Sequence, residues 1–366
     1  MASRSRYGKR SGLLLAFRRR PGRFLQVQRY LRHEREGLLP ASMYGSRDIL
    51  TKENWKDLIL KYNPKEALET LDKVHEKVKL KEAGVPIPAT YLIIETEEDL
   101  ERFIIWLRDR KEGFVIKPSK GHGGSGVLVV SRRVAQRFIL PSNRGVESSY
   151  LLRHAGRIIS GHYTRTVPDR AIVEERLVLS NRLRELMTPG LLDLRVVCFK
   201  GFPVMAMTRL PTKRSGGRAN IHQGAIGAGI SICDGKIVSA TYLRKSIKRH
   251  PTSGKALIGF GFNMWEEILE TSVNAAECMG MGFVGVDLTV SEGKGVTVLE
   301  VNKRPGLEIQ NANRAGMKRR IRWVERYLRK NKLKEGEIGP GIKVELARSW
   351  DRAGWRRTEV PAMEEE

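Results

Sequence analysis

Two strand-like segments of this sequence carry acidic side chains where apolar ones are expected. In "VGVDLTVSEGKGVTVLEVNKRPGLEIQ", residues 284–310, runs of Val, Leu and Thr flank a glycine-rich turn, which is the composition of a β-hairpin. If residues 292–295 form a four-residue loop, counting back along both strands places Asp287 opposite Glu300. Facing carboxylates about 5 Å apart repel each other unless a positive charge lies between them.

A divalent cation would satisfy this arrangement. Asn302 shares the face of Glu300, because side chains two residues apart on a strand point to the same side. Mg²⁺ prefers oxygen ligands and usually takes one or two carboxylates together with phosphate oxygens. We therefore predict a metal site at Asp287, Glu300 and Asn302. The alternative is a pair of solvent-facing carboxylates on an exposed sheet.

A second segment suggests where phosphates would bind. In "FVIKPSKGHGGSGVLVV", residues 114–130, Lys117 ends one strand and a glycine-rich loop leads into the next. Such a loop brings backbone amides against phosphate oxygens, and the lysine adds a point charge. The loop matches neither a Walker nor a Rossmann pattern, so a purely structural turn is equally open. Its predicted binding residues are Gly121, Gly123, Gly124, Ser125 and Gly126.

Two further segments are candidate binding sites once the predicted metal site and the glycine-rich loop are considered together. Asp72 and Lys73 begin a helical stretch, where Lys73 is either a second phosphate ligand or a solvated charge. "RAIVEERLVL" places Glu174 and Glu175 at the end of an apolar strand that could offer backbone groups to an adenine ring. A charged edge that discourages aggregation would look the same.

In chain order these motifs resemble those of the ATP-grasp superfamily, and within it the RimK-type glutamate ligases. The resemblance covers residues 72–320 and rests on "AGVPIPAT", "FVIKPSKGHGGSGV", "IVEERL", "DLRVVCFKG", "RANIHQGA" and "GVDL…LEVNKRPGLEIQ". "VMAMTRLPTKRSGGRANIHQGAIGAGI" and "RPGLEIQNANRAGMKRR" look like the alpha-L-glutamate ligase-like, sugar-transfer-associated branch.

This resemblance implies an α+β fold in which two lobes with antiparallel sheets grip ATP. It implies transfer of the γ-phosphate to a carboxylate and then attack by an amine, with two Mg²⁺ ions for which Mn²⁺ could substitute. The implied nucleotide ligands are Lys73 and Lys117 for the phosphates, Glu174, Glu175 and Leu177 for adenine, and Asp193 for the ribose hydroxyls. Arg218, Asn220 and Arg304 would face the reacting groups. Arg195 is added as a binding residue, with a sheet ion pair as its alternative.

The chain departs from the family pattern at its beginning. Full ATP-grasp ligases have about a hundred residues before the first motif, whereas about seventy precede Asp72 here. The predicted organisation is a basic arm (1–42), a reduced helical region (43–90), a first lobe (91–178), a second lobe (179–335) and a tail (336–366). The arm is either a solvated tail, a start placed too early, or a membrane or nucleic-acid contact.

Charge and composition bound the partners. Lys and Arg number 67 against 41 Asp and Glu, which favours a polyanionic partner, and much of the excess lies in residues 1–42 and 317–334. Three scattered cysteines and the lack of an apolar run of about 20 residues indicate a cytoplasmic protein, with the arm allowing peripheral contact with the membrane.

The main hypothesis is an ATP-dependent carboxylate-amine ligase acting on a small molecule, peptide or protein. The alternative is an ATP-binding accessory protein of a membrane or sugar-transfer system that has lost ligation. Nucleic-acid binding rests on net charge alone and lacks an aromatic platform. The sequence does not indicate an oligomeric state.

Overall fold

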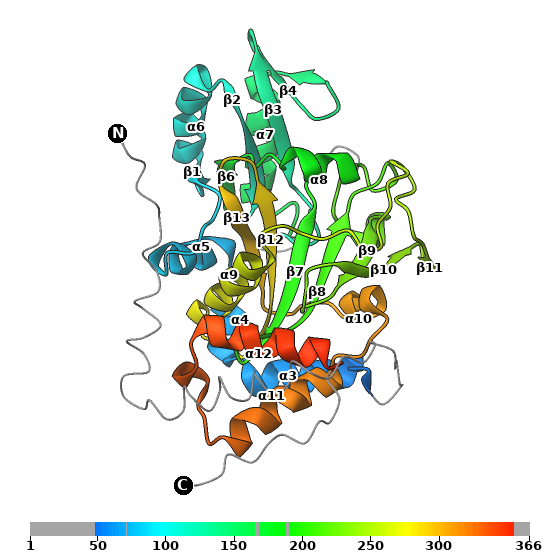
Figure 1. Cartoon of the computed structure of the whole chain (residues 1–366). Helices are drawn as coiled ribbons and strands as arrows, with labels where there is room; N and C mark the ends of the chain where they lie inside the picture. Colours follow the sequence, from blue (N-terminus) through cyan, green and yellow to red (C-terminus); the bar gives the residue numbers. More distant parts are fainter. Residues whose placement is uncertain (1–47, 71, 165–167, 188–189, 355–366) are drawn as a thin grey trace, which may run out of the picture.

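The computed structural model describes residues 48–70, 72–164, 168–187 and 190–354, and the predicted arm (1–42) lies outside them. The chain forms two antiparallel sheets (Figure 1), which confirms the predicted α+β class. The six-stranded sheet has the order β1-β6-β2-β3-β4-β5 and the seven-stranded sheet the order β11-β10-β9-β8-β7-β12-β13.

The strands of the six-stranded sheet are β1 (Thr90–Ile94), β2 (Glu112–Pro118), β3 (Leu128–Val134), β4 (Arg137–Ile139), β5 (Gly145–Val146) and β6 (Ala171–Glu175). Those of the seven-stranded sheet are β7 (Asp193–Phe199), β8 (Phe202–Leu210), β9 (Ile226–Ile230), β10 (Ile237–Tyr242), β11 (Lys245–Ser246), β12 (Phe283–Ser291) and β13 (Gly295–Asn302). The helices are α3 (Lys52–Tyr62), α4 (Lys65–Thr70), α5 (Lys73–Glu82), α6 (Glu97–Asp109), α7 (Ser148–Ile159), α8 (Asn181–Leu186), α9 (Trp265–Cys278), α10 (Glu308–Asn313), α11 (Lys318–Lys330) and α12 (Pro340–Arg352).

Helices α6 and α7 pack on the six-stranded sheet. Phe103 of α6, Phe114 of β2 and Leu151 of α7 are fully buried in the core between these helices and the sheet. Thr96 caps α6, because its side chain accepts from the Asp99 amide while Asp99 accepts in return from the Thr96 amide.

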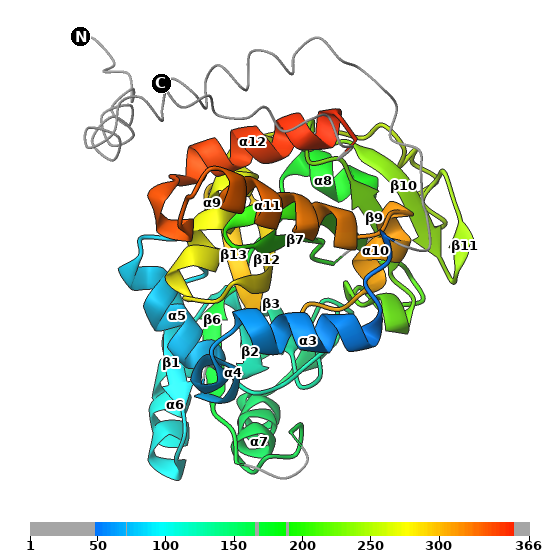
Figure 2. The ribbon, with the colours of Figure 1, turned by 90° about the horizontal axis from the view of Figure 1, so that it is seen from below.

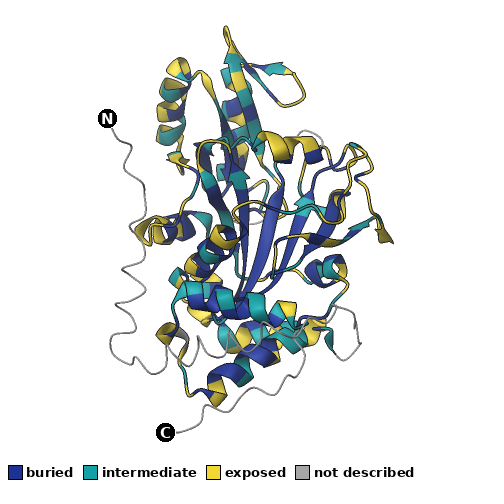
Figure 3. Cartoon of the chain, viewed as in Figure 1, coloured by how far each residue is buried: buried dark blue, intermediate teal, exposed yellow. Residues whose placement is uncertain are grey.

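The seven-stranded sheet holds the larger core. Its strands β7 and β8 are buried over almost their whole length (Figure 3), which agrees with near-continuous apolar runs in their sequences. Sγ of Cys198 donates to the Ser272 carbonyl of α9, so the even-numbered residues of β7 face that helix. The odd-numbered Asp193 and Arg195 therefore point to the opposite face.

The prediction of a tail from residue 336 was wrong for α12. Ile342, Leu346 and Trp350 recur every four residues and bury one face of this helix against the large core. The ring of Trp350 lies 5.5 Å from that of Phe202 on β8. The spacing of these apolar residues is typical of a helix, but the acidic residues at the end of the sequence made the whole segment resemble a tail.

Helices α3 and α5 attach the beginning of the described chain to the seven-stranded sheet. α3 ends before Asn63 and Pro64, where the side-chain amide of Asn63 donates to the Phe283 carbonyl and its oxygen accepts from the Phe283 amide. Gly84 follows the end of α5 with a φ of 68°, which glycine adopts without strain. Figure 2 shows α3 beside the sheet on the side turned to the reader.

The hairpin of β12 and β13 places Asp287 opposite Glu300, as predicted, but by a different route. The loop has three residues, because Ser291 pairs with Gly295, and a bulge at Leu299 shifts the register back by one. The two differences cancel at the carboxylates. In the part of the chain that the structure describes, no helix is long and apolar enough to cross a membrane.

Candidate active site between the two sheets

Helix α5 brings the two sheets together at the site. Its N-cap Asp72 accepts from the amides of Val74 and His75, and its other carboxylate oxygen pairs with Arg170, which precedes β6. These contacts hold the pKa of Asp72 at about 2, since Arg170 and the helix amides outweigh the opposing effect of burial. The helix therefore begins at a fixed point beside the six-stranded sheet.

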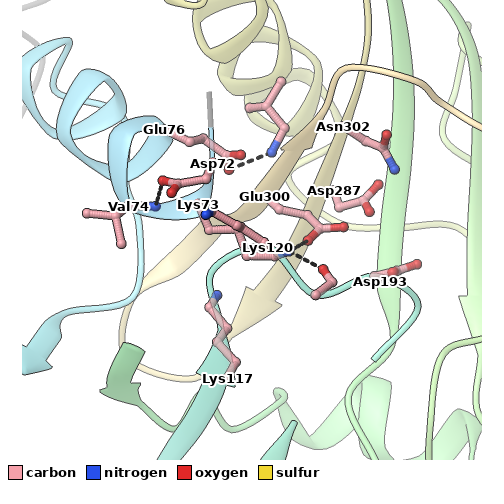
Figure 4. A network of polar contacts seen from close by, with 12 residues as sticks. Asp72, Lys73, Val74, Glu76, Lys117, Lys120, Asp193, Asp287, Glu300 and Asn302 are labelled. Carbon is pink, nitrogen blue, oxygen red and sulfur yellow. Dashed lines mark hydrogen bonds and ion pairs between the residues drawn. The ribbon is translucent and has the colours of Figure 1, made fainter. Parts of the chain in front are cut away.

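Three ionisable side chains of α5 make contacts away from their own helix. Lys73 and Glu76 point toward the β12–β13 hairpin (Figure 4), and Lys77 reaches β6. Lys73 Nζ donates to the Gly121 carbonyl at 2.6 Å and lies 3.5 Å from Glu300. Glu76 Oε1 accepts from the Val301 amide of β13 at 2.6 Å. Lys77 Nζ lies 2.8 Å from Glu174 of β6. One helix thus contacts the glycine loop, the β12–β13 hairpin and the predicted adenine strand.

Lys117 and Glu174 form the base of the site on the six-stranded sheet. Lys117 Nζ lies 2.7 Å from one Glu174 oxygen, and Lys77 lies beside the other. All three side chains are nearly inaccessible to water. Burial opposes the charge on each and lowers the pKa of Lys77, whereas the neighbouring opposite charges lower the pKa of Glu174 and raise that of Lys117. We conclude that two fixed positive charges flank one buried carboxylate.

Asp287 lies in a network of arginines on the seven-stranded sheet. Arg195 Nε and Nη2 each donate to Asp287 at 2.6 Å, and Arg209 Nη2 lies 2.9 Å from the same carboxylate. Arg209 also makes two hydrogen bonds to Asp193. The sheet ion pair left open for Arg195 is therefore present. Both oxygens of Asp193 are bonded to Arg209, an arrangement that suits orienting Arg209 better than holding ribose.

Glu300 is the site carboxylate with the most freedom. Its side chain is 34% exposed, and its 3.5 Å separation from Lys73 is longer than a charge-assisted hydrogen bond. Burial disfavours its charge, yet Lys73, Arg195 and Lys117 together hold its pKa at about 2. Glu300 is therefore ionised at neutral pH and available to a cation.

The glycine loop is anchored at both ends. Both carboxylate oxygens of buried Asp169 accept from the Lys120 amide at 3.0 Å. At the other end His154 Nε2 lies 2.9 Å from the Gly126 carbonyl, and a Cβ on Gly126 would meet the ring of Tyr163 at 2.7 Å. Only glycine fits there, since its φ is 73° as well.

The segment "RAN" reaches the glycine loop from the other lobe. Asn220 Nδ2 donates to the Gly123 carbonyl at 3.0 Å, so a residue after β8 touches the loop between β2 and β3. Gly124 and Ser125 at the loop's tip are exposed. Arg218 is also exposed, and the described residues give it no ion-pair partner.

The remaining predicted residues lie at the margins. Asn302 Oδ1 accepts from the Arg304 amide at 3.0 Å, and the Arg304 side chain is exposed. Glu175 accepts from the Ala89 amide and pairs with Lys294 of the hairpin loop, while Leu177 just after β6 is half-buried. Together these contacts place the end of β6 next to the tip of the β12–β13 hairpin.

Three residues of this network were not predicted from the sequence: Glu76, Lys77 and Arg209. Lys77 and Glu76 follow Lys73 by one helical turn, and this spacing is the signal that could have found them. Arg209 lies opposite Asp193 only because a bulge at Val204 shifts the register of β7 and β8. Counting from the Lys200-Gly201 turn without the bulge would have turned Arg209 to the other face.

A family model described as sugar-transfer associated ATP-grasp matches residues 53–326. The chain belongs to this family. A probable alpha-L-glutamate ligase of Psychromonas ingrahamii is 52% identical over 66 residues, which is 17% of this chain and 20% of that protein. The chain therefore spans only a small part of this curated relative.

Solved structures resemble this ATP-grasp chain at low identity. The ATP-bound D-alanine–D-alanine ligase of Bacillus anthracis is 14% identical with a TM-score of 0.40, over 71% of this chain and 67% of that one. The ATP-grasp ligase PsnB, complexed with a precursor variant, Mg and ADP, is 15% identical with a TM-score of 0.35, over 79% and 61%. The D-cycloserine synthetase DcsG is 11% identical with a TM-score of 0.38, over 90% and 94%. With TM-scores this low, these likenesses carry no argument about substrates.

The donor set of this ATP-grasp chain fits a hard divalent cation. Each oxygen of a carboxylate can accept two bonds, and Asp287 Oδ1 receives only one from arginine. Glu300 is ionised and partly exposed, and Asn302 offers an amide oxygen on the same strand face. The described ranges contain no cluster of three or more His, Cys, Asp or Glu residues that could hold a metal. A cation here would therefore take part of its coordination from phosphate and water.

Proposed function

We propose that this protein is an ATP-dependent carboxylate-amine ligase. A carboxylate oxygen of the acid substrate attacks the γ-phosphorus of ATP, the bond to the β,γ-bridging oxygen breaks, and ADP leaves. The amine nitrogen then attacks the acyl carbon of the acyl phosphate. Inorganic phosphate departs, the amine loses a proton, and an amide bond remains.

The observation that carries this proposal is the convergence of cationic groups from both sheets on one space. Lys117 comes from the six-stranded sheet, Lys73 from α5, and Arg209 from the seven-stranded sheet, and Glu300 and Asp287 lie between them. Phosphoryl transfer between anions needs positive charge aimed at the transferred group, and little covalent work from the protein. An arrangement without a side-chain nucleophile suits this chemistry.

The proposed roles follow the geometry. Lys73, Lys117 and the loop of Gly121, Gly123, Gly124, Ser125 and Gly126 would hold the phosphates, with Asn220 fixing the loop's position. Glu174, Glu175 and Leu177 would line the adenine. Asp287, Glu300 and Asn302 would hold two Mg²⁺ ions, or Mn²⁺ in their place. When bound, these ions neutralise phosphate charge and polarise the γ-phosphoryl group.

Arg218 and Arg304 are the proposed ligands of the acid substrate and its acyl phosphate. The site carboxylates Asp287, Glu174 and Glu300 already have protein cations beside them. Arg218 and Arg304 are exposed and have no acidic partner in the part of the chain that the structure describes. Their charge is therefore free for incoming anions. The short match to a glutamate ligase supports an amino acid such as glutamate as one substrate.

The alternative is an ATP-binding accessory protein without ligation. The two arginines on Asp287 favour it to the extent that they compete with a metal for this carboxylate. The two functions differ in one result, because an accessory protein binds Mg-ATP but releases no phosphate with any acid and amine pair.

The test is a phosphate-release screen of amino acids and short acidic peptides with Mg-ATP. We expect turnover with at least one pair and a loss of about 100-fold or more in kcat for Glu300→Ala. Glu292→Ala is the matched control, since this exposed carboxylate sits in the tip of the same hairpin. Full turnover in Glu300→Ala would show that the proposed site is wrong. Nucleotide binding without phosphate release across the screen would favour the accessory protein.

A further inference from the structure

A stripe of cations runs along α11 on the side away from the core. Lys318, Arg322, Arg326 and Arg329 follow one another at intervals of three or four residues and so share one helix face. Ile321, Val324 and Leu328 bury the opposite face. From Lys318 to Arg329, a rise of eleven steps at 1.5 Å each, the stripe extends about 17 Å.

The charges of the stripe are not neutralised by the fold. Arg322 and Arg329 are exposed and Lys318 and Arg326 half-buried, and none has an ion-pair partner in the described ranges. Two acidic groups beside the stripe are engaged elsewhere, and the exposed Glu53 and Asp57 of α3 are outnumbered on that helix by the exposed Lys52, Lys56 and Lys61. Glu325 accepts from the Tyr62 hydroxyl, and Asp48 pairs with Arg319. The stripe therefore presents uncompensated positive charge to the solvent.

Helix α3 widens this surface and adds an apolar side chain. Lys318 Nζ donates to Asn54 Oδ1 at one end of the two helices, and Tyr62 bonds to Glu325 towards the other, so α3 and α11 lie side by side and parallel. Leu60 of α3 is 69% exposed. Figure 2 shows both helices on the side turned to the reader.

The chain enters the described structure at the same surface. A Cβ on Gly316, just before α11, would meet the Asp48 carbonyl at 2.0 Å, so residue 48 lies against the start of α11. The preceding 47 residues contain twelve Lys and Arg and the apolar run "GLLLAF". Alternating basic and apolar clusters are typical of segments that bind the interface of anionic membranes.

We propose that the α3–α11 surface, comprising Leu60 and the cations Lys318, Arg322, Arg326 and Arg329, docks the protein on a membrane rich in anionic phospholipid. Long cationic side chains reach the headgroups while Leu60 enters the acyl boundary. A nucleic acid would use the cations but would have no use for exposed leucine or for the apolar run that precedes the surface. This inference is independent of the proposed ligase activity, because lipid binding is measured without ATP.

The test uses the full chain and sedimentation with vesicles of phosphatidylcholine, with and without 30% phosphatidylglycerol. We expect binding only to the anionic vesicles, weakening as salt rises. Each surface cation contributes about 1 kcal/mol, or about fivefold in partitioning, so Arg322→Gln/Arg329→Gln should bind about 30-fold more weakly. Arg137→Gln/Arg153→Gln, two exposed cations of the other lobe, is the matched control and should bind like the wild type.

Thermal melting of both double variants checks that neither substitution unfolds the chain. Binding to anionic vesicles that is equal in the stripe variant and the wild type would overturn the proposal. A second result would also overturn it: the wild type binds no vesicles but binds a single-stranded RNA oligonucleotide, and the stripe variant loses this RNA binding.

Discussion

Replacing Glu76 by Gln should make the protein's stability less dependent on pH. The Glu76 carboxyl is buried between α5 and β13, and its Oε1 accepts from the Val301 amide. Burial first, and the charge of Glu300 second, raise the pKa of Glu76 to about 8 despite Lys73 and Lys117. Gln keeps an acceptor oxygen for the same amide and carries no charge at any pH.

The sign and size follow from linkage. The pKa of Glu76 lies higher in the folded state than the ordinary value of 4.5, so folding favours the protonated form. The contribution of protonated Glu76 to the stability of the fold is fully present below about pH 4.5 and is lost as pH rises through about 8. At 1.36 kcal/mol per unit, the wild type should lose about 3 kcal/mol relative to Glu76→Gln between pH 5 and pH 8.

The assay is thermal unfolding of the wild type and Glu76→Gln at pH 5.0, 6.5 and 8.0. The melting temperatures of the wild type and the variant should lie close together at pH 5. Between pH 5 and pH 8 the difference, variant minus wild type, should grow by about 5 °C. Glu82→Gln, an exposed residue at the end of the same helix, should show no such change. A variant that is less stable than the wild type at pH 8 would mean that Glu76 is charged in the fold, and the reasoning would be refuted.

Two further predictions concern the anchors of the site. Asp169→Ala removes the acceptor of the Lys120 amide at the start of the glycine loop, so KM for ATP should rise about tenfold with a smaller change in kcat, and Asp169→Asn should restore much of it in steady-state assays. Glu174→Gln leaves two buried lysines without a counter-charge and should cost about 3 kcal/mol in chemical denaturation. Glu175→Gln breaks only a partly exposed pair and should cost less than about 1 kcal/mol; equal losses in the two variants would contradict the buried triad.

The strand patterns and turn residues were sufficient to predict the β12–β13 hairpin, and the family resemblance supplied the two antiparallel sheets. The pairing of Asp287 with Glu300 was predicted correctly only because the shorter loop and the bulge at Leu299 cancel. Alternation and glycine positions are local properties, so the sequence carries them directly. The bulges at Val204 and Leu299 depend on backbone hydrogen bonding between strands and cannot be counted from the chain. Arg209 was missed for this reason.

The ion pairs that balance the charges within the site could also not be predicted from the sequence. The carboxylate pair was predicted to need a cation, and the structure places two arginines and a lysine beside these carboxylates. Arg195 and Lys77 reach their partners across 92 and 97 residues of sequence, from different strands and helices. Such pairs become visible only when the sheets are assembled.

Calorimetric titration with Mg²⁺ and a non-hydrolysable ATP analogue tests the central claim most directly. We predict one saturable site in the wild type, binding weakened at least about tenfold in Lys117→Met, and unchanged binding in Lys111→Met, whose exposed lysine lies just before the same strand. Absence of binding by the wild type, or equal affinity in Lys117→Met, would contradict a nucleotide site between the two sheets.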